Sequence, residues 1–149
     1  MDQPVNHIGP VSHAVFRLAR AHKELAGRLL REIGLYPGQE LLLMQLWSSG
    51  PQRQVDVMRT LASDAATMTR SVQRLERAGL VTRTRNSADA RSVIISATPA
   101  SERLRTAVER VWQELEDRTV AEMTAAQRSG AIRVLERLRS NVEDDRPTG

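Results

Sequence analysis

Polar and cationic side chains gather on one side of the segment 65–78, which has the apolar spacing of a helix and is followed by Gly79. At about 100° per residue, an inward line of Met68, Val72 and Leu75 leaves the opposite side to hydrophilic residues. The outward residues are Arg70, Gln73, Arg74 and Arg77, and Thr67 and Thr69 flank this face. Such a face can bind a polyanion; the alternative is that it is only the solvated side of a helix.

The first two turns of this face carry side chains suited to the edges of DNA bases. Arginine pairs with guanine through two hydrogen bonds and glutamine pairs similarly with adenine, which makes Arg70 and Gln73 candidate base contacts. The hydroxyls of Thr67 and Thr69 can bind phosphates, and their methyl groups can contact thymine. Arg74 and Arg77 lie further along the helix, where contacts to phosphates are expected.

A second polar group follows in residues 82–91. Arg83 and Arg85 alternate with threonines, which places both arginines on one face of a predicted strand, and Asn86 begins a turn. At the tip of that turn, Asp89 can orient the guanidinium of Arg91 toward the minor groove of DNA. The alternative for this pair is an exposed salt bridge that contributes roughly 0–1 kcal/mol.

The elements around these residues predict a helix-turn-helix with a β-hairpin wing. A short helix is expected over 53–62, with Val55, Met58 and either Leu61 or Ala62 facing inward. Ser63 or Asp64 then caps the recognition helix. Strands are expected over 80–85 and 92–97, on either side of the turn.

Long amphipathic helices flank this lobe. One is expected to end at Gly34, a compact apolar helix follows over 39–49, and a third starts at Pro99, after a Thr98 cap, and continues to about Met123. Thr124 and Gln127 form a capping-box pattern that begins the last helix. Each terminal helical block has an apolar stripe, which favours a homodimer over the alternative of a monomeric bundle.

Composition supports a nucleic-acid partner over a membrane. The chain has 149 residues and a formal net charge of +4, with 21 arginines and one lysine, although bias in the source genome would also explain the arginine excess. Residues 53–98 carry eight arginines against four acids, whereas residues 99–145 carry eight against ten. There is no cysteine, no apolar run approaching a membrane span of roughly 18 residues, and no signal-peptide pattern, so a cytoplasmic protein is expected.

Few residues point to small-molecule chemistry. The histidines are His7, His13 and His22, of which His13 and His22 are candidate ligand contacts. His22 lies on the apolar stripe of the first helix, where it could bind a ligand, form a pH-sensitive contact, or be a hydrogen-bonded interface residue. Trp47 could line a ligand pocket or be part of the core. The spacing of His13 and His22 does not suit a metal, and the sequence shows no phosphate loop, nucleophile elbow or carboxylate–histidine pair, so no metal, cofactor or enzyme activity is expected.

The chain resembles the MarR (multiple antibiotic resistance regulator) family of winged-helix repressors over about residues 10 to 142. The segments that match are Gly34-Leu35-Tyr36-Pro37-Gly38-Gln39, Leu46-Trp47, Gly50-Pro51, Thr67-Met68-Thr69-Arg70, Leu75-Glu76-Arg77-Ala78-Gly79-Leu80-Val81, and Asp89-Ala90-Arg91 followed by Val93-Ile94-Ile95. The chain departs from the family at Ala66, where serine or threonine is common, and in lacking the cysteine of the redox-sensing branch.

The resemblance implies one MarR-type domain over 1–149, mainly α-helical with a small β-hairpin wing. Helices in 10–34 and 99–142 would form an obligate dimer, and residues 36–98 would bind a pseudo-palindromic operator in double-stranded DNA. A small, often phenolic or otherwise anionic aromatic effector would release the DNA. The alternative is a winged-helix module for protein association with no operator of its own, whose outward helix face should carry apolar anchors.

Overall fold

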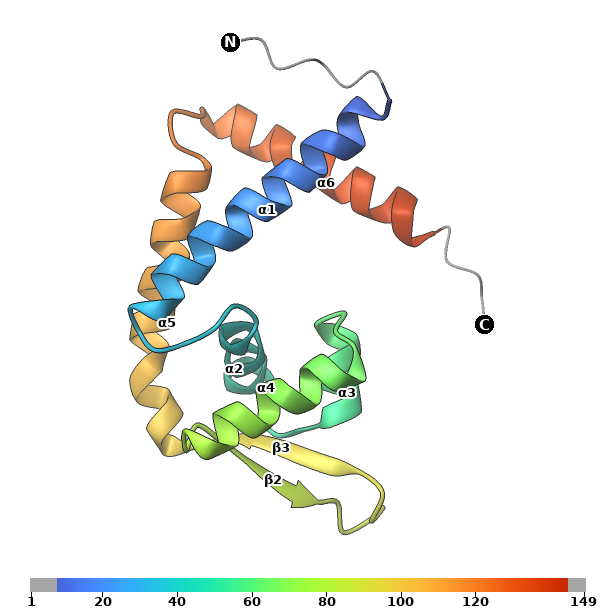
Figure 1. The fold of residues 1–149 in the computed structure, drawn as a ribbon, viewed down its shortest axis with the longest axis vertical. Helices are drawn as coiled ribbons and strands as arrows, with labels where there is room; N and C mark the ends of the chain where they lie inside the picture. The colour runs from blue at the N-terminus through green and yellow to red at the C-terminus, as the bar shows by residue number, and fades with distance from the viewer. Residues whose placement is uncertain (1–7, 145–149) are drawn as a thin grey trace. The chain divides into compact units, whose positions relative to one another are not determined.

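The computed structural model describes residues 8–144 and is mainly α-helical (Figure 1). His7 lies outside the described residues. The chain divides into two compact units after Leu115, within the fifth helix. The elements of residues 8–144 are α1 (Pro10–Arg31), α2 (Gln39–Ser49), β1 (Gln52–Arg53), α3 (Gln54–Thr60), α4 (Ala65–Arg77), β2 (Val81–Arg85), β3 (Val93–Ala97), α5 (Pro99–Thr119) and α6 (Ala125–Glu143). The expected helices and hairpin strands are therefore present.

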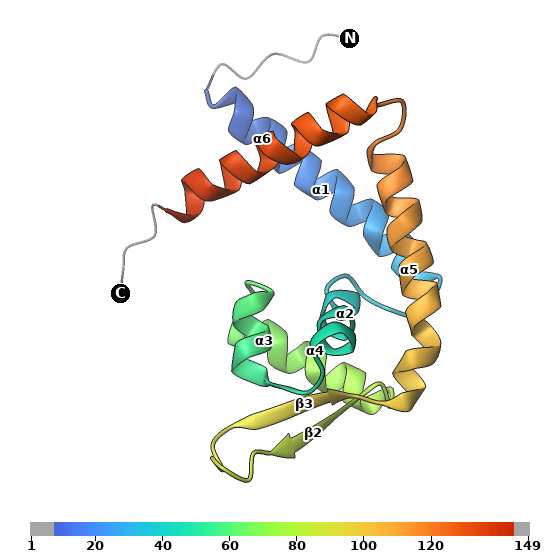
Figure 2. The ribbon, with the colours of Figure 1, turned by 180° about the vertical axis from the view of Figure 1, so that it is seen from behind.

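Helices α2, α3 and α4 and a small sheet make up a winged helix-turn-helix in the first unit (Figures 1 and 2). The sheet is antiparallel, with the strand order β1-β3-β2, and Val81 pairs with Ala97 while Arg85 pairs with Val93. Sequence analysis missed β1, because a strand of two residues shows no alternation of apolar and polar side chains. Its pairing with Ile94 and Ile95 ties the start of α3 to the wing.

One hydrophobic core joins the elements of the first unit. Buried residues come from the C-terminal part of α1, from α2, α3 and α4, from β2 and β3, and from α5. Met68, Val72 and Leu75 are buried as predicted, at 3%, 0% and 1% exposure. Because these three side chains fix the rotation of α4 about its axis, the opposite face must point to solvent.

The rotation of α3 differs from the prediction. Val57 is fully buried, whereas Val55, which was expected to face inward, is exposed. Met58 and Leu61 are half-buried and pack against the core, as expected. The strand pairing of β1 sets the direction in which α3 starts, and a seven-residue helix is too short for its own apolar pattern to determine which side turns inward.

Hydrogen bonds connect the end of α4 to α5 and α2. Gly79 adopts a positive φ of 75°, which ends α4, and the Thr98 hydroxyl donates to the Gly79 carbonyl oxygen at 2.6 Å. Thr98 also caps α5, because its hydroxyl accepts from the backbone N–H of Ser101. The buried Ser101 hydroxyl in turn accepts from the indole Nε1–H of Trp47 at 3.1 Å. The predicted Thr98 cap and Pro99 start are confirmed.

The second unit contains the end of α5 and all of α6. Helix α5 ends at Thr119, four residues before the predicted end at Met123, because residues 120–123 form a turn in which Glu122 has a φ of 63°. The predicted capping box is present: the Thr124 hydroxyl accepts from the Gln127 backbone N–H, and the Gln127 side chain accepts from the Thr124 backbone N–H. Helix α6 has no buried residue in the described chain.

Glu40 in the first turn of α2 gives the fold a testable dependence on pH. Its side chain is 4% exposed, and its Oε2 accepts from the Gly38 N–H at 2.9 Å. Burial raises the pKa of Glu40 above its ordinary 4.5, although backbone hydrogen bonds oppose the shift. A raised pKa means that the folded chain binds this proton more tightly than the unfolded chain does, so stability is lost as the pH rises through the folded-state pKa.

We therefore expect Glu40→Gln to gain stability relative to wild type as the pH rises from about 4.5 to about 7. The gain arises because glutamine keeps an acceptor for Gly38 and carries no buried charge at any pH. Thermal unfolding followed by circular dichroism across this range measures the difference in Tm between the two proteins. A difference that does not change with pH would show that the Glu40 carboxylate is not destabilised by its burial.

Candidate nucleic-acid interface

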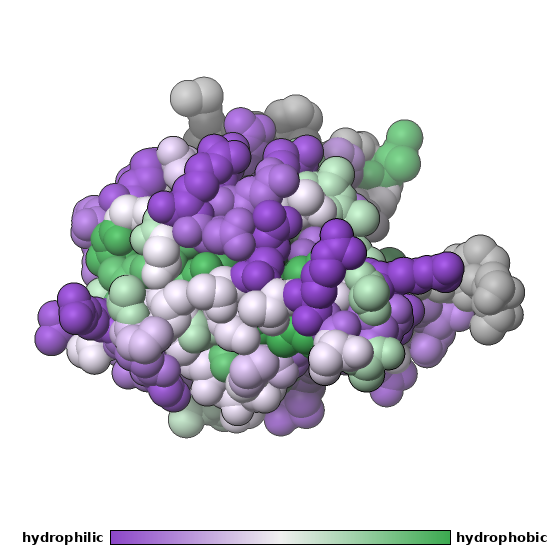
Figure 3. Space-filling model, turned by 90° about the horizontal axis from the view of Figure 1, so that it is seen from below, coloured by the Kyte–Doolittle hydropathy of each residue, from purple (hydrophilic) through white to green (hydrophobic). Residues whose placement is uncertain are grey.

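The outward face of α4 carries exposed polar and cationic side chains from its first turn to its last. Thr67, Arg70, Arg74 and Arg77 are exposed, and no large apolar side chain of α4 is exposed. Seen from below, the surface at the wing end is hydrophilic over much of its area, with smaller apolar patches between the hydrophilic side chains (Figure 3). The rotation predicted from the helical period is therefore confirmed.

Hydrogen bonds at the start of α4 hold Arg70. Asp64 caps the helix: its Oδ1 accepts from the Thr67 backbone N–H and its Oδ2 accepts from the Thr67 hydroxyl, both at 2.8 Å. The Thr67 oxygen in turn accepts from Nη2 of Arg70 at 3.4 Å. The backbone N–H of Thr67, followed by its hydroxyl and the charge of Arg70, lowers the pKa of Asp64, so this cap is ionised at neutral pH. Thr67 thus orients Arg70, a role that the sequence did not suggest.

The other two polar residues on this part of α4 are less accessible. Thr69 is half-buried, and its hydroxyl accepts from Nε2 of Gln54 at 3.4 Å, which links α3 to α4. Gln73 is also half-buried, on the same helix as the exposed Arg70 and Arg74. Of the two predicted base contacts, Arg70 is therefore the exposed one and Gln73 is half-buried.

The last turn of α4 carries Arg74 and Arg77, both exposed. The guanidinium carbon of Arg74 lies 5.4 Å from the centre of the Tyr36 ring, which belongs to the loop between α1 and α2. Cations in this position over an aromatic face are attracted by its negative π surface. Arg74 is thus held near the surface by a residue outside the helix-turn-helix.

Arg83 on β2 points toward α4. It shares a sheet face with the buried Val81, and its guanidinium binds the Glu76 carboxylate, with Nε 3.2 Å from Oε2 and Nη2 3.2 Å from Oε1. Both side chains are 37% exposed, so the pair contributes at most about 1 kcal/mol to stability. Arg83 was grouped with the DNA contacts, but here it connects the wing to the recognition helix.

The wing tip is organised by its own side chains. Asn86 Oδ1 accepts from the Ala88 N–H, and Nη1 of Arg85 donates to the Ala90 carbonyl oxygen. Asp89 Oδ1 accepts from the backbone N–H of Arg91 at 3.0 Å, and its Oδ2 accepts from the Ser92 hydroxyl at 3.2 Å. Asp89 therefore orients Arg91 through the backbone, where a contact with the guanidinium was expected. The Arg91 side chain is exposed.

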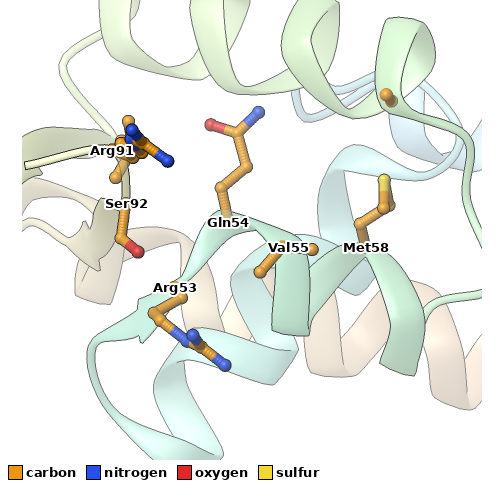
Figure 4. Close-up of a pocket in the computed structure, with 8 residues that line it drawn as sticks. Arg53, Gln54, Val55, Met58, Arg91 and Ser92 are labelled. Atoms are coloured by element: carbon orange, nitrogen blue, oxygen red, sulfur yellow. The ribbon is translucent and has the colours of Figure 1, made fainter. Parts of the chain in front are cut away.

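A hollow of about 320 Å³ separates the wing from α3 and the start of α4. Figure 4 shows Arg91 and Ser92 of the wing on one side of it and Gln54, Val55 and Met58 of α3 on the other. At its edge, Arg53 binds both carboxylate oxygens of Asp56, at 2.7 and 3.0 Å. This ion pair lowers the pKa of Asp56, first through the hydrogen bond from Arg53.

The three candidate ligand residues differ in exposure and in hydrogen bonding. His13 is exposed on α1, His22 is half-buried on the same helix, and the indole N–H of the half-buried Trp47 is used by Ser101. Three hollows of the described chain, at the wing, along α1 and beside Tyr36, are lined by none of them.

Residues 8–144 contain no group of three or more acidic or histidine side chains placed to bind a metal. None of the helices between residues 8 and 144 has the length and apolar character needed to cross a bilayer.

Comparison with known proteins shows the family. The model of the MarR family matches residues 35–93, which include the helix-turn-helix and most of the wing. The organic hydroperoxide resistance transcriptional regulator of Bacillus subtilis is 30% identical over 101 residues, which cover 66% of this chain and 69% of that protein. The chain belongs to the MarR family. It spans about two thirds (66% and 69%) of the length of two curated relatives that it matches.

Solved structures share the fold of this MarR-family chain. A mutant MarR from E. coli, in complex with operator DNA, superposes with a TM-score of 0.83 at 20% identity, covering 92% of this chain and 99% of that one. BpsR of Bordetella bronchiseptica, whose DNA binding is regulated by 6-hydroxynicotinic acid, gives a TM-score of 0.80 at 23% identity, covering 87% and 98%. The relatives that this chain matches include transcriptional regulators, and the E. coli MarR structure contains operator DNA.

Sequence analysis missed four residues that shape this MarR-family site. Tyr36, Gln54 and Glu76 contact Arg74, Thr69 and Arg83 respectively, and Ser92 binds Asp89. Of these contacts, only that between Asp89 and Ser92 joins near neighbours in the sequence, where an Asx turn could have indicated it. The others join different elements, so no local pattern could have revealed them.

Proposed function

We propose that this protein is a homodimeric transcriptional repressor that binds a pseudo-palindromic operator in double-stranded DNA. The observation that carries the proposal is the outward face of α4, where Arg70, Arg74 and Arg77 are exposed and no large apolar side chain is. A lobe that bound only proteins would need apolar anchors at this place. The exposed Arg91 of the wing supports a second contact, in the minor groove.

The proposed DNA-binding lobe is residues 36–98. In the major groove, Arg70 and Gln73 would contact base edges, while Thr67 and Thr69 support them from the first turns of α4. Arg74, Arg77 and Arg85 would contact phosphates, and Asn86 and Asp89 would shape the tip that carries Arg91. Arg83 would act mainly through its ion pair with Glu76.

The proposed dimerisation region is residues 10–34 and 99–142. On α1, Val11, Val15 and Leu18 follow one stripe and are between 44% and 57% exposed. On α6, Ile132, Leu135 and Val142 are exposed at 62%, 47% and 74%. Apolar stripes of this kind on long helices are typical of a surface that a second subunit covers.

A small, aromatic or phenolic ligand is proposed to release the operator. The support is the relation to BpsR, whose DNA binding 6-hydroxynicotinic acid regulates. Of the two histidines that the structure describes, His22 is the better placed for such a ligand, because it is half-buried on the apolar stripe of α1. His13 and Trp47 are less suited, since His13 is exposed and the indole N–H of Trp47 is already bonded.

Footprinting of the purified protein on fragments of its own genome tests the proposed function. We expect protected sites made of two inverted half-sites whose centres lie about one helical turn of DNA, or a multiple of it, apart. Binding to all fragments with equal affinity would contradict a sequence-specific regulator, and protection of single half-sites would contradict the dimer.

Arg91→Ala should weaken binding to every DNA sequence by a similar factor and reduce the slope of log K against log salt by about 1. The reason is that a minor-groove or phosphate contact contributes counterion release and no hydrogen-bond pattern specific to one base. Fluorescence anisotropy at several salt concentrations measures both quantities. Arg110→Ala, which removes an exposed arginine of α5 outside the lobe, is the matched control. A slope equal to that of wild type would remove Arg91 from the contacts.

A further inference from the structure

A second cationic site lies beside the loop between α1 and α2. Arg74 projects from α4 over the face of Tyr36, with 5.4 Å between the guanidinium carbon and the ring centre. Tyr36 is 58% exposed, so burial of its ring in the core does not explain its position. An exposed aromatic ring in this position attracts the guanidinium and limits the directions in which Arg74 can point.

The loop that carries Tyr36 is firmly held. The Tyr36 N–H donates to Oε1 of Gln39 at 3.0 Å, and the Tyr36 carbonyl oxygen accepts from the Gln39 N–H at 3.1 Å. Gln39 itself is 6% exposed. On the far side of the loop, Gly38 has a φ of 97°, which only glycine adopts easily, and its N–H is bound by Glu40. The ring is thus attached to a backbone with little freedom to move.

The ring and two arginines surround an open hollow of about 400 Å³. The residues that line it are Gly34, Leu35, Tyr36, Gln39, Arg74, Leu75, Arg77, Ala78 and Leu80. These include two cations and no acidic residue. This volume is many times the roughly 30 Å³ that one water molecule occupies in the liquid, so the hollow has room for one phosphate group.

Arg74 and Arg77 also counteract the helix dipole at the C-terminal end of α4. The C-terminal end of α4 carries partial negative charge, which by itself would repel an anion. Arg74 and Arg77 both lie in the last turn and bring two full positive charges to that end. An anion that entered the hollow would therefore meet a net positive site, next to a phenol group able to donate a hydrogen bond.

We propose that Arg74 and Arg77 bind a backbone phosphate of DNA, and that Tyr36 is the positioning residue that holds Arg74 toward it. This inference rests on the proposed function, because the occupant is the DNA backbone flanking the bases that α4 contacts. Arg74 lies one turn along the same helix from Arg70, so a phosphate beside the major groove can reach it while Arg70 contacts a base.

The test compares Tyr36→Leu, Tyr36→Phe and Arg74→Ala in operator binding across a salt series. Tyr36→Leu should weaken binding about 2- to 5-fold and lower the salt slope, because Arg74 loses its attraction to the ring. Tyr36→Phe keeps the aromatic face and should restore most of the affinity. Arg74→Ala should lower the slope by about 1, and adding Tyr36→Leu to it should cause no further loss.

Preference for the operator over altered base pairs should stay unchanged in all three variants, and Arg110→Ala should behave as wild type. If wild type binds its operator but Tyr36→Leu has the same affinity and slope, the proposal is wrong while the proposed function stands. Additive losses in the double variant would also overturn it. A free anion, and not DNA, occupies the hollow if two results are found together. The first is that the salt slope of Arg74→Ala equals that of wild type. The second is that inorganic phosphate at matched ionic strength raises the Tm of wild type more than that of Arg74→Ala. Absence of operator binding by wild type would instead overturn the proposed function.

Discussion

Arg70→Ala should weaken operator binding by about 5- to 150-fold, equivalent to roughly 1–3 kcal/mol, and should remove the preference at one base pair of each half-site. Arg70 is exposed near the start of α4, where base contacts of a recognition helix concentrate, and Thr67 and Asp64 already orient its guanidinium. Because the side chain is held before DNA arrives, little rotamer entropy has to be lost on binding. Competition in a gel shift, with operators altered one base pair at a time, measures both effects.

Arg70→Lys separates charge from hydrogen-bond geometry. Lysine keeps the positive charge but lacks the planar pair of donors that matches guanine. We expect this variant to retain the wild-type salt slope and still lose discrimination at the same base pair. Unchanged discrimination in Arg70→Ala would show that Arg70 does not contact a base, whatever its effect on affinity.

Leu135→Glu should convert the protein to a monomer of about 17 kDa and weaken operator binding by more than about 100-fold. Leu135 lies within the exposed apolar stripe of α6, so a carboxylate there would be buried without a partner in the proposed interface. Once the two lobes separate, each must bind its half-site alone, and the gain from a linked second contact is lost. Light scattering coupled to size exclusion gives the mass, and anisotropy gives the affinity.

Ser129→Glu is the matched control, because it adds the same charge to an exposed polar position of α6 that lies about 120° around the helix from Leu135. It should remain a dimer and bind DNA as wild type does. Circular dichroism should show that Leu135→Glu keeps its helices, since Leu135 is 47% exposed and belongs to no buried core. A Leu135→Glu protein that is still dimeric at micromolar concentration would contradict an interface through this face of α6.

Local signals in the sequence predicted most of the fold. The caps at Asp64, Thr98 and Thr124 bind backbone groups within three residues, so the sequence alone contains both partners. The buried line of α4 follows from its helical period, which is why the outward face was placed correctly. Where such signals were absent, prediction failed: β1 was missed, α3 was rotated, and α5 was extended past the turn that contains Glu122.

The candidate site likewise has features that local sequence signals predicted and features that only the tertiary structure showed. The sequence was sufficient to place Arg70, Arg74 and Arg77 on the outward face of α4, because the helical period determines which residues share a face. It could not show that Arg83 is bound to Glu76 or that Asp89 acts through the backbone of Arg91, because these contacts depend on side-chain directions within the packed lobe. The contacts of all these residues with DNA remain predictions, which the variants described above test.

What the sequence by itself determined is therefore the set of elements, their caps, and the polar face of α4, since each depends on residues within one or two helical turns. Only the tertiary structure decided which of the arginines already form a hydrogen bond, an ion pair or a ring contact, and with which residue. Tyr36 and Arg74 are 38 positions apart in the chain and meet because the core fixes α4 against the loop before α2. No local period in the sequence predicts this contact, because it arises from how the elements pack, and the whole core determines their relative rotation.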